Sequence, residues 1–338
     1  MSNTTRFFDL PEIQQNINSP EIQRATYQNV KTFSTPVELD SDLLEGLQSA
    51  RFSVAEPSDK NAEGVIVMPV PWSGSPERNF SQTMTQLMAN VSGNRTIVVG
   101  IPGMGGDKTD KHNKLTEEQI EEARNGHMRS ISVVAWKALQ QNNVLKNDTG
   151  ETLPVALWLN SLGTLSGSEM LATAPSEIEV ADVYLSESIA LREMNPVEMA
   201  SLFALKASKH FIEYRKSNVG ADIGPPGVHL AKKVVAQPIS HIEMVRAASK
   251  GNQISILAEA IDKGASTISS DTLFHVIRAG EGLVRPEDNI MLTEFLKKSL
   301  QRRFGIKSKI RTQELTGEGH GFQDSFPIIQ SIVKDLSI

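Results

Sequence analysis

The sequence contains no cysteine. Disulfide bonds, catalysis by a thiolate and zinc sites built from cysteine are therefore excluded. No stretch approaches the roughly 18 consecutive apolar residues that a membrane-spanning helix needs. A basic segment followed by an apolar run of signal-peptide length is also missing. We therefore expect no membrane span and a cytoplasmic location.

A long block of one charge is also absent. The chain has 34 basic and 40 acidic residues, which gives a formal net charge of -6, so we expect neither nucleic acid nor a membrane surface as its main partner. No pair of its seven histidines has the H-x-x-x-H or H-E-x-x-H spacing of a helical metal site, and the glycines of residues 100–106 lack the G-x-G-x-x-G spacing of a dinucleotide loop. We expect no metal and no cofactor. The sequence is compatible with a homo-oligomer but does not fix the oligomeric state.

Short apolar runs rich in β-branched residues are the main structural signal. They lack strict alternation, which is typical of strands buried on both faces of a parallel sheet. The runs are residues 64–70, 95–101, 154–159, 180–185 and 271–279, and residues 308–316 are predicted to form a last strand. Helical patterns lie between them, such as residues 79–91 and 116–142, the second with Thr116 as N-cap. This alternation predicts an α/β protein with a doubly wound, mostly parallel sheet.

The strand–helix alternation stops between residues 191 and 263. Three helical patterns follow one another there without a strand, over residues 196–216, 238–251 and 253–264. A helical insertion between two strands of the sheet is the simplest interpretation. The predicted organisation is an N-terminal arm over residues 1–54, a core over residues 55–190 and 264–338, and the insertion over residues 191–263.

Ser161 comes directly after the predicted strand of residues 154–159. Ligands of parallel sheets bind at the carboxyl ends of the strands. On a sharp strand-to-helix turn, Ser161 would be a nucleophile and the backbone N–H of Leu162 would face a bound carbonyl. Such a turn needs small neighbours, a need that Gly163 meets and Leu159 does not. An ordinary helix N-cap is the alternative, and this segment alone favours it.

Other strand ends carry further candidates. Trp72 follows the run of residues 64–70. Its N–H could be a second oxyanion donor, or the segment could be a plain structural turn. His320 lies in a glycine-flanked loop after the last predicted strand. Glu281 and Asp288 follow the run of residues 271–279, where a carboxylate could orient the imidazole or belong to a solvated acidic loop.

These segments together resemble the α/β-hydrolase fold, over roughly residues 55–338. The chain order is serine, then acid, then histidine. "GIPGMGG" resembles the D-x-P-G-x-G turn of that fold, "GEGLVRPED" its G-x-x-D-x-x-V-P acid loop and "GEGHGF" its histidine loop. The insertion is placed where the family inserts its helical cap.

The sequence also departs from the family pattern. The elbow does not read G-x-S-x-G, because Leu159 replaces the first glycine. Val70-Pro71 or Pro69-Val70 replaces the usual His-Gly oxyanion turn. The acid loop lacks aspartate at the usual place and is about two residues shorter, so Glu281 is the first candidate for the acid and Asp288 the second.

The resemblance implies a serine hydrolase for an ester or a related small acyl substrate, acting through a covalent acyl-enzyme. Ser161, His320 and Glu281 would form the triad, and the N–H groups of Leu162 and Trp72 would form the oxyanion hole. The cap would shape a pocket for an apolar or mixed substrate. Acyl transfer, amide cleavage, C–C cleavage and a non-catalytic role in binding a ligand or partner stay open.

Overall fold

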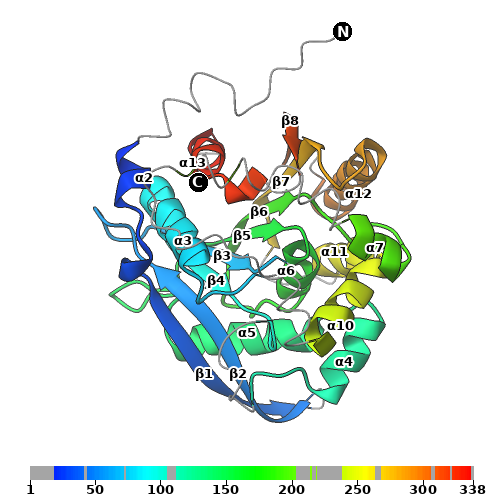
Figure 1. Ribbon diagram of the computed structural model, residues 1–338, viewed down its shortest axis with the longest axis horizontal. Helices are drawn as coiled ribbons and strands as arrows, with labels where there is room; N and C mark the ends of the chain where they lie inside the picture. Colours follow the sequence, from blue (N-terminus) through cyan, green and yellow to red (C-terminus); the bar gives the residue numbers. More distant parts are fainter. Residues whose placement is uncertain are drawn as a thin grey trace.

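The computed structural model describes residues 19–41, 44–71, 74–104, 112–202, 214, 218, 238–262, 268–305, 309–319 and 322–335. Its strands form one eight-stranded sheet in the order β1-β2-β4-β3-β5-β6-β7-β8 (Figure 1). The strands are β1 (Lys31–Ser41), β2 (Leu44–Ala55), β3 (Val65–Pro69), β4 (Arg95–Val99), β5 (Val155–Asn160), β6 (Val180–Ser186), β7 (Ile268–Glu281) and β8 (Ile310–Gly319).

The helices alternate with these strands along most of the chain. They are α2 (Pro20–Arg24), α3 (Asn79–Ser92), α4 (Glu117–Arg124), α5 (Arg129–Gln141), α6 (Gly163–Ala172), α7 (Pro196–Leu202), α10 (Pro238–Ser249), α11 (Gln253–Asp262), α12 (Pro286–Phe304) and α13 (Phe326–Asp335). Two short 3₁₀ turns are η2 (Tyr27–Asn29) and η4 (Phe322–Asp324).

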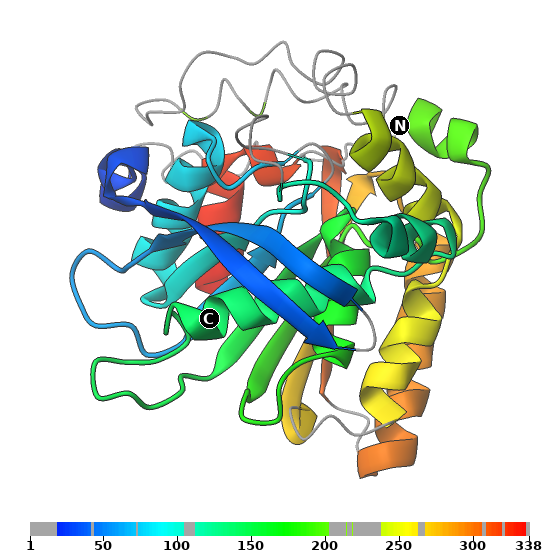
Figure 2. The ribbon, with the colours of Figure 1, turned by 90° about the horizontal axis from the view of Figure 1, so that it is seen from below.

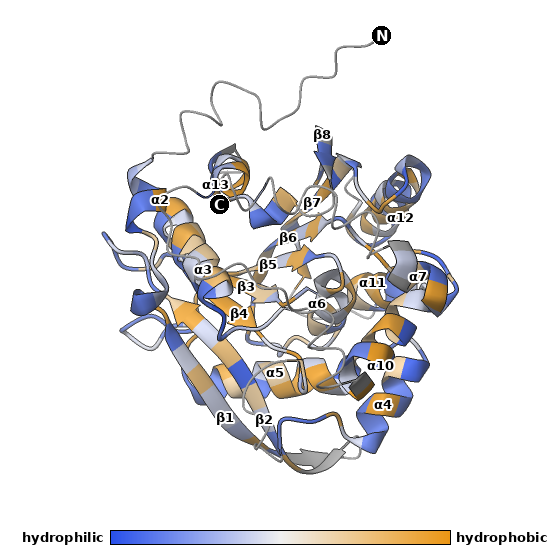
Figure 3. Cartoon of the chain, in the orientation of Figure 1, coloured by the Kyte–Doolittle hydropathy of each residue, from blue (hydrophilic) through white to orange (hydrophobic). Residues whose placement is uncertain are grey.

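The six strands from β3 to β8 pair in parallel, and they correspond to the five apolar runs and the last predicted strand of the sequence. Both faces of this sheet are covered, which explains why the runs are apolar without alternation. Hydrophobic residues line the strands from β3 to β6, whereas much of α12 is hydrophilic (Figure 3). The prediction of a doubly wound, mostly parallel α/β sheet is confirmed.

Side chains of successive strand residues enter two different cores, one on each face of the sheet. Leu157 and Leu159 of β5 belong to the core that contains residues of α5, α6, α11 and α12. Ala156 and Trp158 belong to the core that contains residues of α3 and α13. Figures 1 and 2 show these two helical layers on opposite sides of the strands. The helices therefore hold the carboxyl ends of β5, β6 and β7 at one edge.

The segment before residue 55 contributes to the sheet. β1 and β2 pair antiparallel, from Lys31 opposite Val54 to Ser41 opposite Leu44, and β2 pairs antiparallel with β4. The short helix α2 is anchored on α13, because the Ser19 hydroxyl donates to the Gln330 side-chain oxygen at 2.8 Å. These elements were not predicted from the sequence, and the limits of the predicted domains stay a prediction.

The pattern over residues 116–142 forms two helices, so the prediction of a continuous helix was wrong. Thr116 is the N-cap of α4, as predicted, and forms a capping box with Gln119. Gly126 interrupts the pattern because it adopts a φ of +82°, a conformation that glycine reaches at low cost. The break allows α5 to leave α4 and to pack on the sheet, where Trp136 is buried.

Helices α7, α10 and α11 lie between β6 and β7 in the chain, and the described residues there contain no strand. Figure 1 shows them gathered with α4 on one side of the molecule. The predicted helix of residues 196–216 begins at Pro196 as α7, where the Asn195 side chain accepts from the Val197 N–H at 2.8 Å. Most of the predicted helix beyond Leu202 lies outside the described residues. No described helix is long and apolar enough to cross a membrane.

An ion pair links α6 to the break between α4 and α5. His127 Nδ1 lies 2.9 Å from Glu169 Oε1, and Glu169 is buried on α6. The hydrogen bond to Glu169, together with the Glu122 and Glu259 carboxylates nearby, holds the pKa of His127 above its usual value despite partial burial. A raised pKa in the folded state contributes stability that is present below the unfolded pKa of about 6.5 and is lost as pH rises through the folded pKa.

We predict that the free energy of unfolding falls by about 0.5 kcal/mol as pH rises from 6 to 8, the size expected of a partly exposed ion pair. Urea unfolding at a series of pH values measures this change. His127→Gln should lack this part of the pH dependence. A fall of the same size in His127→Gln would contradict the assignment to this pair.

Candidate active site

Ser161 lies on the turn between β5 and α6 with a φ of +53°. Its N–H donates to the Ser186 carbonyl at 3.1 Å, and its carbonyl accepts from the Thr164 N–H at 3.0 Å. The N-cap of α6 is Leu162, without a side-chain capping bond, so Ser161 is not the helix cap that its segment alone favoured. A serine at positive φ costs on the order of 1–2 kcal/mol, and such residues gather at functional sites.

The two neighbours that the sequence analysis weighed, Gly163 and Leu159, both fit this turn. A Cβ at Gly163 would lie 2.5 Å from the Pro69 carbonyl oxygen at the end of β3, so only glycine is accommodated there. The predicted crowding by Leu159 does not occur, because its side chain occupies the space beside Gly167 on α6. A Cβ at Gly167 would overlap the Leu159 side chain. The space that a glycine at position 159 would leave between β5 and α6 is provided by Gly167 on the helix instead.

The N–H of Leu162 is at the amino end of α6, where the helix dipole favours negative charge. Among the described residues it donates no hydrogen bond. Val70 packs in the same hydrophobic cluster as Leu162, so the turn after β3 lies beside the elbow. Trp72, the second predicted oxyanion donor, lies outside the described residues.

The insertion contacts the turn that follows β4. Ser240 of α10 packs against Gly103, where a Cβ would overlap the Ser240 hydroxyl. His241, also on α10, is buried. Burial and the nearby Arg78 guanidinium hold the pKa of His241 below its usual value. The start of α10 is therefore packed against the turn that follows β4.

The chain after position 320 is anchored near the elbow. His320 itself lies outside the described residues, but β8 ends at Gly319, directly before it. Three residues after it, the Gln323 side-chain amide donates to the Ser186 hydroxyl at 2.6 Å. Because the Ser186 carbonyl accepts the Ser161 N–H, the chain following His320 is anchored beside the serine.

The two predicted acids have different surroundings. Glu281 is exposed at the end of β7, where it pairs in register with Gly319. Asp288 lies in the first turn of α12, where its carboxylate is 3.4 Å from the Arg192 guanidinium. Neither position tests the role that the sequence analysis assigned, so both stay predictions.

A third carboxylate, which the sequence analysis missed, lies at the end of β6. Glu187 is completely buried and has a φ of +47°. Its Oε1 accepts from the Ala279 N–H at 2.7 Å and its Oε2 from the Leu283 N–H at 3.1 Å. Glu187 could have been found from the sequence, because it comes shortly after the predicted strand of residues 180–185. Ser161 was selected by the same criterion, its position after a predicted strand.

No protein-family model matches the chain, and no curated protein matches it. Solved structures do match. An esterase from Pyrobaculum calidifontis is 14% identical, with 96% of this chain and 89% of that chain covered and a TM-score of 0.50. A thermostable esterase from Pseudomonas putida ECU1011 is 12% identical, with coverages of 97% and 90% and a TM-score of 0.47. A cold-adapted esterase from an Arctic intertidal metagenomic library is 10% identical, with coverages of 91% and 94% and a TM-score of 0.48.

The chain has the α/β-hydrolase fold. The eight-stranded, mostly parallel sheet with helices on both faces agrees with the Pyrobaculum calidifontis structure. The predicted fold resemblance is therefore confirmed. Ligands of open α/β sheets bind outside the carboxyl ends of the strands, which is the edge at which Ser161 and Glu187 lie.

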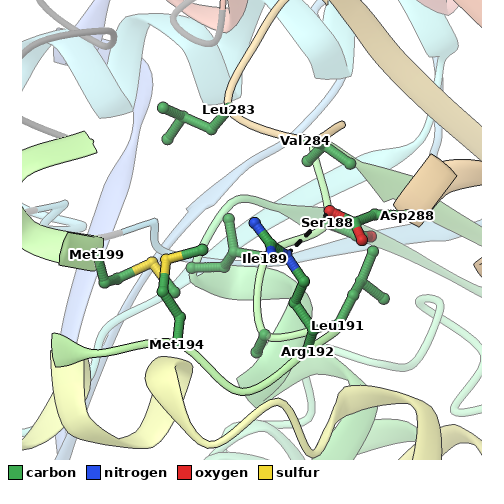
Figure 4. A pocket seen from close by; sticks show the side chains of 10 residues that line it. Ser188, Ile189, Leu191, Arg192, Met194, Met199, Leu283, Val284 and Asp288 are labelled. Carbon is green, nitrogen blue, oxygen red and sulfur yellow. Dashed lines mark ion pairs between the residues drawn. The ribbon is translucent and has the colours of Figure 1, made fainter. Parts of the chain in front are cut away.

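A small cavity opens at this edge, between the segments that follow β6 and β7 (Figure 4). Its lining is largely apolar, with the Arg192–Asp288 ion pair as its charged part. The lining residues are Ser188, Ile189, Ala190, Leu191, Arg192, Met194, Met199, Leu283, Val284 and Asp288. Within the described residues, no group of three histidine, aspartate or glutamate side chains could hold a metal ion.

The fit of Leu159 beside Gly167 generates a test. We predict that Gly167→Ala lowers the free energy of unfolding by about 1–3 kcal/mol, because the added methyl overlaps the leucine. In a Leu159→Ala background, which removes that overlap, the same change should cost less. Urea unfolding of the four proteins of this double-mutant cycle measures the difference. Equal costs in both backgrounds would contradict the packing described here.

Proposed function

We propose that the chain is a serine hydrolase that cleaves an ester or a related acyl substrate through a covalent acyl-enzyme. The observation that carries the proposal is the left-handed backbone of Ser161. Nothing in a helix cap requires that conformation, because capping serines are extended. A strained strand-to-helix turn at the carboxyl end of a parallel strand instead directs a serine hydroxyl to the edge where ligands bind.

In the proposed reaction, Ser161 Oγ attacks the acyl carbon while His320 accepts the hydroxyl proton. The N–H groups of Leu162 and Trp72 bind the oxyanion of the tetrahedral intermediate. His320 then gives its proton to the departing alcohol, which leaves the acyl group on Ser161. A water molecule, deprotonated by His320, releases the acid and restores the serine.

The support for His320 comes from the chain on either side of it. Gly319 ends a strand of the parallel sheet, and Gln323 is hydrogen-bonded to Ser186. Ser186 in turn accepts the Ser161 N–H. These two anchors on either side of position 320 are the support for His320 as the base. The carboxylate that orients its imidazole was assigned from the sequence to Glu281, with Asp288 as the alternative.

The substrate proposed is a small molecule with an apolar or mixed group. The cavity beyond β6 supports this, because Leu191, Met194 and Met199 line it together with one ion pair. The residues of this wall belong to, or directly precede, the insertion, which we propose to act as the cap. A cytoplasmic location and a reaction without metal or cofactor belong to the same proposal.

The burial of Ser161 favours a second candidate function, binding of a ligand or partner without catalysis. The residue is 3% exposed, so little of it faces solvent. Kinetics of the purified chain separate the two functions, because only the hydrolase loses an activity when the hydroxyl is removed.

We predict that Ser161→Ala lowers kcat/KM for p-nitrophenyl esters at least about 10³-fold, because the nucleophile is lost. Initial rates with a series of rising acyl chain length measure this and size the pocket. Ser166→Ala is the matched control, since Ser166 is also a buried serine and lies nearby on α6. It should keep kcat/KM within about threefold. Equal activity of Ser161→Ala and the wild type would contradict the hydrolase.

A further inference from the structure

Glu187 has two features that a structural residue at a strand end seldom combines. Its side chain is completely buried, and its φ of +47° is a conformation that residues other than glycine and asparagine avoid. Such a backbone costs on the order of 1–3 kcal/mol and persists only where the surroundings fix it. The N–H of Glu187 contributes to this by donating to the Ile277 carbonyl on β7 at 2.9 Å.

The end of β7 and the backbone directly after it surround the Glu187 carboxylate. The N–H groups of Ala279 and Leu283 donate to its two oxygens, and these residues lie on either side of Glu281 and Gly282. A Cβ at Gly282 would overlap the carboxylate, so glycine is required there. This segment is the loop in which the sequence resemblance placed the acid. The backbone of this loop does bind a carboxylate, but that carboxylate belongs to Glu187, which directly follows β6.

The two carboxylates of the loop itself are held differently. The side chain of Glu281 is exposed at the end of β7, and that of Asp288 pairs with Arg192 at the cavity wall. A carboxylate that orients an imidazole through a reaction is ordinarily buried and fixed by hydrogen bonds. Of the three, only Glu187 meets both conditions.

Glu187 also adjoins the anchors of the proposed catalytic groups. Its neighbour Ser186 accepts the Ser161 N–H and the Gln323 side-chain amide. Glu281, which lies between the two N–H donors to Glu187, pairs in register with Gly319, the residue before His320.

We propose that Glu187 is the positioning residue of this site. Its carboxylate accepts the second N–H of the His320 imidazole, fixes the tautomer that can take the proton from Ser161, and stabilises the imidazolium that forms. It does so in place of Glu281 and Asp288. The inference rests on the proposed function, because it assigns the third member of the proposed triad.

Glu187→Gln tests the assignment, because glutamine keeps the size of the side chain and removes its charge. We expect kcat/KM for a p-nitrophenyl ester to fall about 10²–10⁴-fold. Glu281→Gln and Asp288→Asn should each cost at least about 30-fold less than Glu187→Gln. Glu169→Gln is the control for loss of a buried carboxylate, and it should retain the wild-type kcat/KM within about threefold.

A purely structural role is separated by a double-mutant cycle with His320→Ala. If Glu187 acts through His320, Glu187→Gln should cost less than about threefold in the His320→Ala background. The apparent pKa of the base in the kcat/KM profile should also fall in Glu187→Gln, because a carboxylate beside an imidazole raises its pKa. An equal cost in both backgrounds would overturn the assignment.

Two further outcomes complete the test. If Glu187→Gln does not fold, Glu187→Asp keeps the charge but shortens the reach, and we expect at least a tenfold loss of kcat/KM in folded protein. Full activity of Glu187→Asp would overturn the inference. If Ser161→Ala or His320→Ala retains full activity, the proposed function itself fails. If Ser161→Ala and His320→Ala both lose activity but Glu281→Gln lowers kcat/KM more than Glu187→Gln does, the proposed function stands and only the assignment of Glu187 is overturned.

Discussion

The close contact between Gly163 and the Pro69 carbonyl is the constraint on which the candidate site depends. It brings the start of α6 against the end of β3 without room for a side chain. The chain must therefore turn sharply between β5 and α6, and Ser161 takes the left-handed backbone of that turn. The strain, about 1–2 kcal/mol, is offset by the packing of α6 on the sheet. Leu159 and Gly167 belong to that packing, since they fit each other across the strand–helix interface.

Ser186 joins the elbow to the other strand ends. Its carbonyl holds the Ser161 N–H, its hydroxyl accepts from Gln323, and Glu187 follows it directly. The carboxylate of Glu187 then ties β6 to the loop after β7. Three segments far apart in the sequence are thus fixed to one point at the carboxyl edge of the sheet. Rigid placement of this kind is what a proton relay among side chains needs.

The central sheet could be predicted because its strands are buried on both faces, so that their sequences are continuous apolar runs. β1 escaped prediction because its sequence, "KTFSTPVELDS", is polar and interrupted by proline at the sheet edge. The break between α4 and α5 depends on Gly126, whose positive φ no periodicity reveals. The helical pattern continues on both sides of it, so the sequence indicated a single helix.

The serine turn could be located from the sequence, but the role of Gly167 and the position of Glu187 could not. Gly167 supplies the room that position 159 lacks, and only the packing of α6 on β5 brings these two residues together. Glu187 was missed because the resemblance assigns the acid by chain order, after β7. The backbone there binds a carboxylate, yet its source is visible only in three dimensions.

The central claim is that the turn at Ser161 presents a reactive nucleophile. Covalent labelling tests it most directly, because a fluorophosphonate reacts with an activated serine and the modified peptide identifies the residue by mass spectrometry. We predict one adduct per chain, on the peptide that contains Ser161, and no adduct in Ser161→Ala. Absence of labelling in the folded wild-type protein, or labelling that persists in Ser161→Ala, would contradict the claim.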